Sequence, residues 1–82
     1  MDQSDVKILF GKRIRELRKL RGWSQEEFAL HVGLDRSYVG GVERGERNVS
    51  LENICLISAA LGIPTSKLFE GWTAEAPSPD LT

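Results

Sequence analysis

The sequence predicts an all-α fold, a compact five-helix bundle, and three observations lead to that prediction. Apolar residues recur three or four positions apart through most of the chain, which is the period of an amphipathic helix. No segment shows the strict apolar and polar alternation of a strand. Residues that cap helices and glycines that end them divide the chain into short helical segments. The 82 residues leave room for one domain with a modest core.

The first predicted helix covers residues 5–20. Phe10, Ile14 and Leu17 form an apolar stripe along it, so one side of this helix should face the core. Six basic residues and one acid occupy residues 12–21. This pattern fits either an anion-binding surface or a solvated helix face.

Residues 24–31 and 35–44 are predicted to form two short helices around a tight turn. Ser24 is followed three residues later by a glutamate, which is the spacing of a capping box. Gly33 can adopt the left-handed backbone that ends the first helix, and Asp35 caps the second. A connection this short makes the two helices cross steeply, which is a helix-turn-helix arrangement.

Residues 51–61 are predicted to form a fourth helix, which Ser50 caps and Gly62 ends. Its apolar residues extend beyond one face, so we expect a second buried side that meets another chain. A short fifth helix follows, capped by Thr65 or Ser66. The lone cysteine is expected to be a small buried hydrophobe. The predicted inward face of the fourth helix comprises Leu51, Ile54, Cys55, Ser58 and Leu61.

Composition divides the chain into a predicted domain at residues 1–71 and a flexible tail at residues 72–82. The tail is small, polar and proline-bearing, which is typical of disordered segments. No apolar run approaches the roughly 20 residues that cross a bilayer, and the N-terminus does not resemble a signal peptide. We therefore expect a cytoplasmic protein without a membrane partner.

Charge and side-chain inventory narrow the classes of function. The net charge is −1, with a balance of +2 over residues 1–50 and −3 over residues 51–82, so the first part is the candidate anion-binding part. The chain has one histidine, one cysteine and no glycine-rich phosphate loop after a strand. We therefore expect neither an enzyme nor a metal site nor a cofactor.

The sequence resembles the helix-turn-helix family of Cro, the phage repressors and the Xre-type regulators. The resemblance covers about residues 10–69 and rests on IRELRKLRGWSQEEFA, HVGLDRSYVGGVERGERNVSLENI and ISAALGIPTSKLF. It implies a lambda-repressor-like DNA-binding domain. It also implies an ion pair between Arg18 in the first helix and Glu43 near the end of the recognition helix. A narrower resemblance, through LDRSYVGGVERGERN, is to the controller proteins of restriction-modification systems.

If the helix at residues 35–44 lies in the major groove, its first residues meet base edges. The guanidinium of Arg36 can bond O6 and N7 of one guanine together. The predicted base contacts are Arg36, Ser37 and Tyr38, although Tyr38 could equally be packed. The predicted backbone contacts are Ser24, Gln25, Arg44, Arg47 and Asn48, to which Lys12, Arg13 or Arg15 could add. Glu46 in their midst weakens the local positive field.

Two features near the recognition helix have two interpretations each. Trp23 either packs on Phe28 as a hydrophobic staple or lies against a DNA backbone. Gly40 and Gly41 are unusual inside a helix, where each costs about 0.5 to 1 kcal/mol relative to alanine. They either remove side chains where the helix presses on DNA, or permit close packing on the preceding helix or a loosened helix end.

Helix-turn-helix proteins usually pair across a two-fold axis, so we predict a homodimer on a palindromic operator with half-site centres about 10 bp, or a multiple, apart. The predicted dimer interface comprises Leu56, Ala60, Ile63, Leu68 and Phe69, with Trp72 as a further candidate. Alternatively, Leu68 and Phe69 only close the monomer core.

The predicted function is that of a sequence-specific transcriptional regulator bound to double-stranded DNA, controlling restriction-modification genes. The alternative is an antitoxin or protein-interaction module on the same scaffold, because fold does not settle function. An activator would also contact RNA polymerase, but no residue identifies that surface.

Overall fold

The computed structural model describes residues 3–70, and this part of the chain is all-α, as predicted. It contains α1 (Gln3–Leu20), α2 (Gln25–Val32), α3 (Arg36–Glu43), α4 (Leu51–Leu61) and α5 (Thr65–Leu68). The last of these is a single turn of four residues. The predicted tail at residues 72–82, and with it Trp72, lies outside the described residues.

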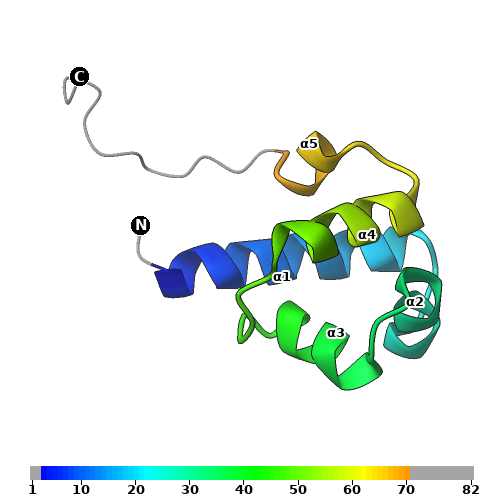
Figure 1. Cartoon of the computed structure of the whole chain (residues 1–82), viewed down its shortest axis with the longest axis horizontal. Coiled ribbons are helices and arrows are strands. Elements are labelled where there is room, and N and C mark those ends of the chain that lie inside the picture. Colours follow the sequence, from blue (N-terminus) through cyan, green and yellow to red (C-terminus); the bar gives the residue numbers. More distant parts are fainter. Residues whose placement is uncertain (1–2, 71–82) are drawn as a thin grey trace.

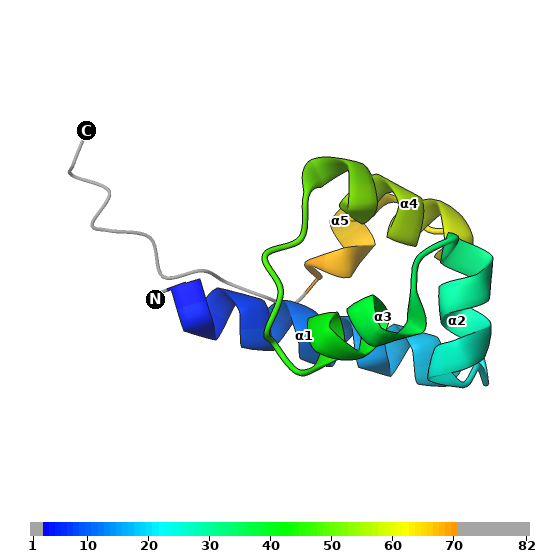
Figure 2. The ribbon, with the colours of Figure 1, turned by 60° about the horizontal axis from the view of Figure 1, so that its bottom comes forward.

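The helices pack around α1, the longest of them. α1 contacts both α3 and α5, while α2 contacts α3 and α4. Figure 1 shows α2 at one end of α1, α3 along the lower edge, and α4 and α5 along the upper side. In the turned view of Figure 2, α3 lies in front of α1, and α4 and α5 remain above it. Thus α3 lies at an edge of the molecule. No helix among residues 3–70 is long and apolar enough to cross a membrane.

The core takes side chains from all five helices. Its largest fully buried members are Ile14, Phe28, Ile57, Leu61 and Leu68, which come from α1, α2, α4 and α5. Val39 and Val42 add the inner face of α3. These two valines hold α3 against the core by its second half, because the first two residues of that helix are exposed.

The local signals at α2 and α3 act as the sequence predicts. The amide of Ser24 donates to Glu27 Oε1 at 2.8 Å, and the amide of Glu27 donates to Ser24 Oγ at 3.0 Å, which completes the capping box. Gly33 ends α2 with a φ of +83°. The Asp35 carboxylate accepts a bond from the amide of Ser37 at 3.2 Å and so caps α3.

Trp23 takes the first of its two proposed roles. Its ring stacks on Phe28 with 6.1 Å between ring centroids, and on His31 with 4.2 Å. The side chain of Arg21 lies over the same ring and also donates to the carbonyl of Leu61 at the end of α4. This cluster fixes the corner between α1 and α2.

The Arg18–Glu43 ion pair joins α1 to α3. Arg18 Nε donates to Glu43 Oε2 at 2.7 Å and Nη2 donates to Oε1 at 3.0 Å, so the pair is bidentate. The remaining Nη1 donates to the carbonyl of Trp23 at 2.8 Å. The Glu43 side chain is 3% exposed, and the hydrogen bond from Arg18 to Glu43 raises the pKa of the arginine. This buried, fully bonded pair fixes how α3 lies on α1.

Two other arginines of the basic stretch at residues 12–21 also have structural partners. Arg13 donates to the carbonyl of Lys67 at 3.0 and 2.8 Å and pairs with Glu16 at 2.6 Å, so it secures α5. Arg21 contacts α4, as described above. With Arg18, three of the six basic residues in residues 12–21 hold the fold together.

Three predictions about α4 and α5 were wrong. Cys55 is exposed, and Leu51 is 80% exposed, because the inward face of α4 is formed by Ile57, Ser58 and Leu61. The helix is apolar on more than one side, and the sequence did not show which stripe meets the core. The cap of α5 is Pro64, whose ring fixes φ near −65°, and no side-chain bond from Thr65 or Ser66 forms there.

The buried pair leads to a stability prediction. Replacing Glu43 by alanine leaves the Arg18 guanidinium buried without its partner, which typically costs about 3 to 5 kcal/mol. Because this loss is a large part of the roughly 5 kcal/mol or more that stabilises a small domain, we expect E43A to melt far below wild type. Circular dichroism melting tests this. The control is Glu46→Ala, which removes an exposed ion pair and should leave the melting temperature almost unchanged. Equal melting of E43A and wild type would contradict the structural role.

Candidate nucleic-acid interface

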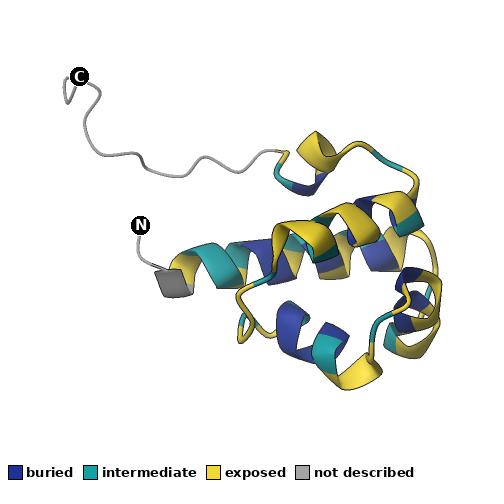
Figure 3. Ribbon diagram, viewed as in Figure 1, coloured by how far each residue is buried: buried dark blue, intermediate teal, exposed yellow. Residues whose placement is uncertain are grey.

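The first turn of α3 projects from the body of the molecule. Arg36 and Ser37 are exposed, whereas Val39 and Val42 further along the helix are buried. Figure 3 shows this change of exposure along α3. Arg36 has no hydrogen-bond or ion-pair partner among residues 3–70. Its guanidinium is therefore free to bond a partner outside the protein.

Ser37 is bonded to the cap of its own helix. Its hydroxyl and its amide both donate to the carboxylate of Asp35. The hydroxyl bond is the main cause of a lowered pKa at Asp35, since it stabilises the ionised carboxylate. With its hydrogen given to Asp35, the Ser37 hydroxyl presents only oxygen lone pairs to an external partner.

Tyr38 is half-buried against the core and is held from two sides. Asn53 Nδ2 of α4 donates to the Tyr38 hydroxyl at 3.1 Å. The guanidinium of Arg47 lies over the ring, 5.4 Å from its centroid. The tyrosine is thus packed, yet its hydroxyl keeps its own hydrogen for another acceptor. Asn53 was missed in the sequence analysis, because nothing in the spacing of residues 38 and 53 indicates that they meet.

The start of α2 presents two further polar side chains. Ser24 Oγ accepts the capping bond from the amide of Glu27, and its hydroxyl also bonds the Glu27 carboxylate. Gln25 Nε2 donates to Glu43 Oε1 at 3.0 Å, which ties this side chain to the buried ion pair. The amide nitrogen of Gln25 carries a second hydrogen that remains available. Helix N-termini favour anions, although Glu26 and Glu27 in the first turn of α2 offset that preference here.

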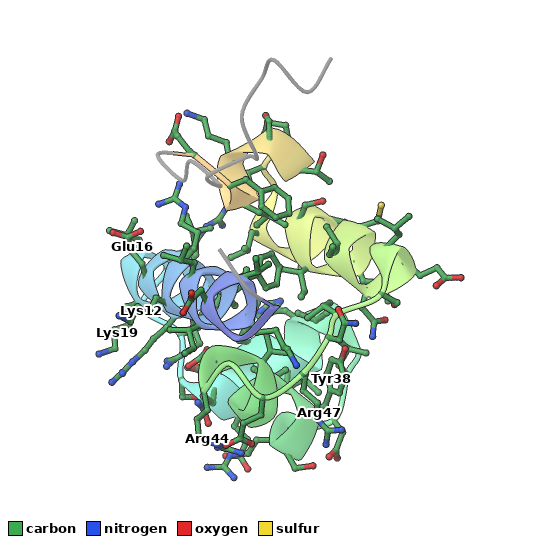
Figure 4. The ribbon with its side chains drawn as sticks, turned by 90° about the vertical axis from the view of Figure 1, so that its left-hand side faces the viewer. Lys12, Glu16, Lys19, Tyr38, Arg44 and Arg47 are labelled. Carbon is green, nitrogen blue, oxygen red and sulfur yellow. The ribbon has the colours of Figure 1, made fainter. Side chains whose placement is uncertain are left out.

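The predicted backbone contacts that follow α3 are all exposed, and they comprise Arg44, Arg47 and Asn48. Arg44 forms an ion pair with Glu46 through bonds of 3.0 and 3.2 Å. This bond raises the pKa of Arg44 and lowers that of Glu46, so both groups stay charged near neutral pH. Figure 4 places Arg44 and Arg47 at the α3 side of the molecule, away from Lys12 and Lys19 on α1.

The predicted dimer residues divide into two groups. Leu68 is 0% exposed and belongs to the monomer core, so its assignment to the interface was wrong. The reason is that α5 folds back onto α4 and α1 and closes the core with this side chain. Phe69 is half-buried, with its ring 5.5 Å from that of Phe10. The structure leaves Leu56, at 45% exposure, and the half-buried Ala60 and Ile63 on the surface of α4 and the turn after it.

Comparison with known proteins gives a consistent set of relatives. A family model described as helix-turn-helix matches residues 14–68. Control protein C.MunI from Mycoplasma sp is 51% identical over 67 residues, covering 80% of this chain and 90% of its own length. Control protein C.BamHI from Bacillus amyloliquefaciens is 41% identical over 68 residues, covering 82% of this chain and 84% of its own.

Solved structures of two controller proteins are similar to this one. The restriction-modification controller protein C.AhdI from Aeromonas hydrophila has 57% sequence identity and a TM-score of 0.77, covering 79% of this chain and 98% of that one. The controller protein C.Esp1396I, solved as a tetramer with its natural 35 base-pair operator, has 31% identity and a TM-score of 0.72. That comparison covers 78% of this chain and 84% of that one.

The two cap carboxylates lead to a prediction for acid conditions. Hydrogen bonds from the amide and hydroxyl of Ser24 lower the pKa of Glu27, as those from Ser37 lower that of Asp35. The folded protein therefore binds fewer protons than the unfolded chain as the pH falls, and its stability decreases below about pH 5. We expect Glu27→Gln, which cannot titrate, to flatten this dependence.

Thermal melting of wild type, E27Q and D35N between pH 3 and pH 7 measures the effect. The two variants should each lose less stability than wild type over this range. If all three proteins lost the same stability between pH 7 and pH 3, the two capping carboxylates would not contribute to the loss.

Proposed function

This chain belongs to the helix-turn-helix family, and we propose that it is a sequence-specific DNA-binding regulator of transcription that acts as a homodimer on a palindromic operator. The observation that carries the proposal is the exposed first turn of α3 with the unpartnered guanidinium of Arg36. A helix fits the major groove of B-DNA, and an arginine at its start can bond O6 and N7 of a guanine.

The side chains around α3 suit the backbone of the same DNA. Ser24 and Gln25 at the start of α2, and Arg44, Arg47 and Asn48 after α3, are proposed to bond phosphate oxygens on the two sides of the groove. Such bonds fix the position of the protein without reading sequence. Ser37 and Tyr38 are proposed to lie beside Arg36 at base edges.

The relatives support a specific regulatory context. C.MunI and C.BamHI are named control proteins, and C.AhdI is named a restriction-modification controller protein. C.Esp1396I has been solved on operator DNA, as a tetramer. We propose that this chain likewise controls restriction-modification genes. A dimer that activates transcription would also present a surface to RNA polymerase.

A single domain of this size buries too little surface for tight and specific binding, which is why a dimer forms part of the proposal. The exposed stripe of Leu56, Ala60 and Ile63 is the proposed interface, with the half-buried Phe69 at its margin. These apolar side chains would be shielded from water by the same stripe of a second copy.

A gel-shift assay with the DNA upstream of the gene tests the function. We expect the purified protein alone to bind that DNA in preference to unrelated DNA, with an affinity that falls as salt rises. Binding without sequence preference, or binding only together with a second protein, would favour the antitoxin or interaction module.

Arg36 provides the most direct test of base reading. R36A should lose about 1 to 3 kcal/mol of discrimination, roughly fivefold to 150-fold in affinity ratio, between the operator and a variant with the contacted guanine replaced. Fluorescence anisotropy titrations measure the ratio. Lys19→Ala, at an exposed α1 lysine that lies away from Arg44 and Arg47 in Figure 4, is the matched control and should keep wild-type discrimination. An unchanged ratio in R36A would remove Arg36 from the base contacts.

The dimer stripe can be tested with two charge substitutions on one helix. L56E places two carboxylates at the proposed two-fold contact and should raise the dimer dissociation constant by about 100-fold or more. L51E, at a residue of α4 that is 80% exposed but outside the stripe, should leave the dimer intact. Sedimentation equilibrium measures both. Dissociation in L51E alone would place the interface at the start of α4 instead.

A further inference from the structure

Two consecutive glycines, Gly40 and Gly41, lie inside α3, where either weakens the helix relative to alanine. Neither needs glycine for its backbone, since the positive φ values among the described residues occur at other glycines. Both are buried although they have no side chain of their own. Other side chains must therefore cover them.

The covering atoms belong to residues of the proposed DNA contacts. A Cβ on Gly41 would lie 3.1 Å from both Cγ and Nε of Arg47. A Cβ on Gly40 would lie 3.1 Å from Nη1 of Arg44 and 3.5 Å from Oε1 of Gln25. No backbone of a neighbouring helix comes this close to either glycine, so close helix packing does not explain them.

We propose that Gly40 and Gly41 are positioning residues that let the side chains of Arg44 and Arg47 lie across α3. This inference rests on the proposed function and deepens it. The glycines act through the two arginines, and DNA does not press on the glycines directly.

The path of Arg47 shows what the missing methyl group permits. From the loop after α3 the side chain runs over Gly41 and places its guanidinium above the ring of Tyr38. Tyr38 is in turn bonded to Asn53 of α4. Figure 4 shows Tyr38 and Arg47 lying together at the α3 side. A guanidinium held in this way loses less conformational freedom when it binds a phosphate.

Arg44 is held in a corresponding way over Gly40. Its Nε and Nη2 bond Glu46, while Nη1 lies over the glycine beside the Gln25 side chain. Each glycine thus leaves space for one arginine side chain, and a substitution at either glycine fills that space separately.

Filling the space over Gly41 should change the stability of the fold and the affinity for DNA in opposite directions. A methyl group at residue 41 crowds the middle of a flexible side chain and not backbone, so the fold can accommodate it as Arg47 shifts. Alanine also favours the helix, so the melting temperature of G41A should stay the same or rise. Affinity for the operator should fall by about tenfold, because Arg47 loses its prepared position for a charged hydrogen bond.

A double-mutant cycle tests whether Gly41 acts through Arg47. Affinities of wild type, G41A, R47A and G41A/R47A for the operator are measured by anisotropy at several salt concentrations. We expect G41A to weaken binding and to lower the salt slope by up to about one per protomer, yet to change nothing further in the R47A background. The matched control is G41A with R44A, whose effects should be additive.

Direct pressure of DNA on the glycine gives a different result. G41A would then weaken binding by the same factor with and without Arg47, which overturns the inference.

NMR of the free protein gives a readout that does not depend on DNA. The Arg47 Nε–H signal, shifted by the Tyr38 ring, should move toward the position of an exposed arginine in G41A. An unmoved signal also overturns the inference. Failure of wild type to prefer its operator would instead count against the proposed function.

Discussion

The buried ion pair between Arg18 and Glu43 is the interaction on which the arrangement of α3 depends. It joins α1 to the last residue of α3, and the same carboxylate accepts a bond from Gln25 at the start of α2. The guanidinium also donates to the carbonyl of Trp23 in the corner between α1 and α2. One pair therefore holds three of the elements that present the proposed DNA contacts. Buried pairs are often no better for stability than apolar contacts, but this one also fixes orientation.

The internal bonds of other basic residues bear on how a chain with a net charge of −1 can bind DNA. Arg13, Arg18 and Arg21 are bonded to other helices, and Glu46 partly neutralises Arg44. With acids slightly outnumbering bases, the chain as a whole attracts DNA of any sequence only weakly. Affinity must then come from a few placed contacts and from the pairing of two copies, and this favours discrimination over general attraction to phosphate.

The sequence predicted what local chemistry decides, and it failed where packing between distant segments decides. The caps at Ser24 and Asp35 act within three residues, so their spacing was sufficient. Cys55 was misplaced because α4 is apolar on several sides, and only the packing of α2 and α5 selects the inward stripe. Leu68 was misplaced because the return of α5 onto the core has no local signal. The bond from Asn53 to its partner in α3 spans fifteen residues and likewise has none.

The internal bonds of the proposed interface also determine which partner each side chain can accept. Tyr38 uses an oxygen lone pair internally and keeps its hydroxyl hydrogen. The side-chain amide of Gln25 donates one hydrogen bond to Glu43 and has a second hydrogen to donate. Phosphate oxygens and the O6 and N7 atoms of guanine only accept hydrogen bonds, so these donors match the backbone or a guanine edge. Ser37 has the opposite arrangement, with its hydrogen given to the helix cap, and the acceptor that remains matches the amino group of a cytosine or an adenine. The free protein thus already separates side chains that offer a hydrogen-bond donor from one that offers an acceptor.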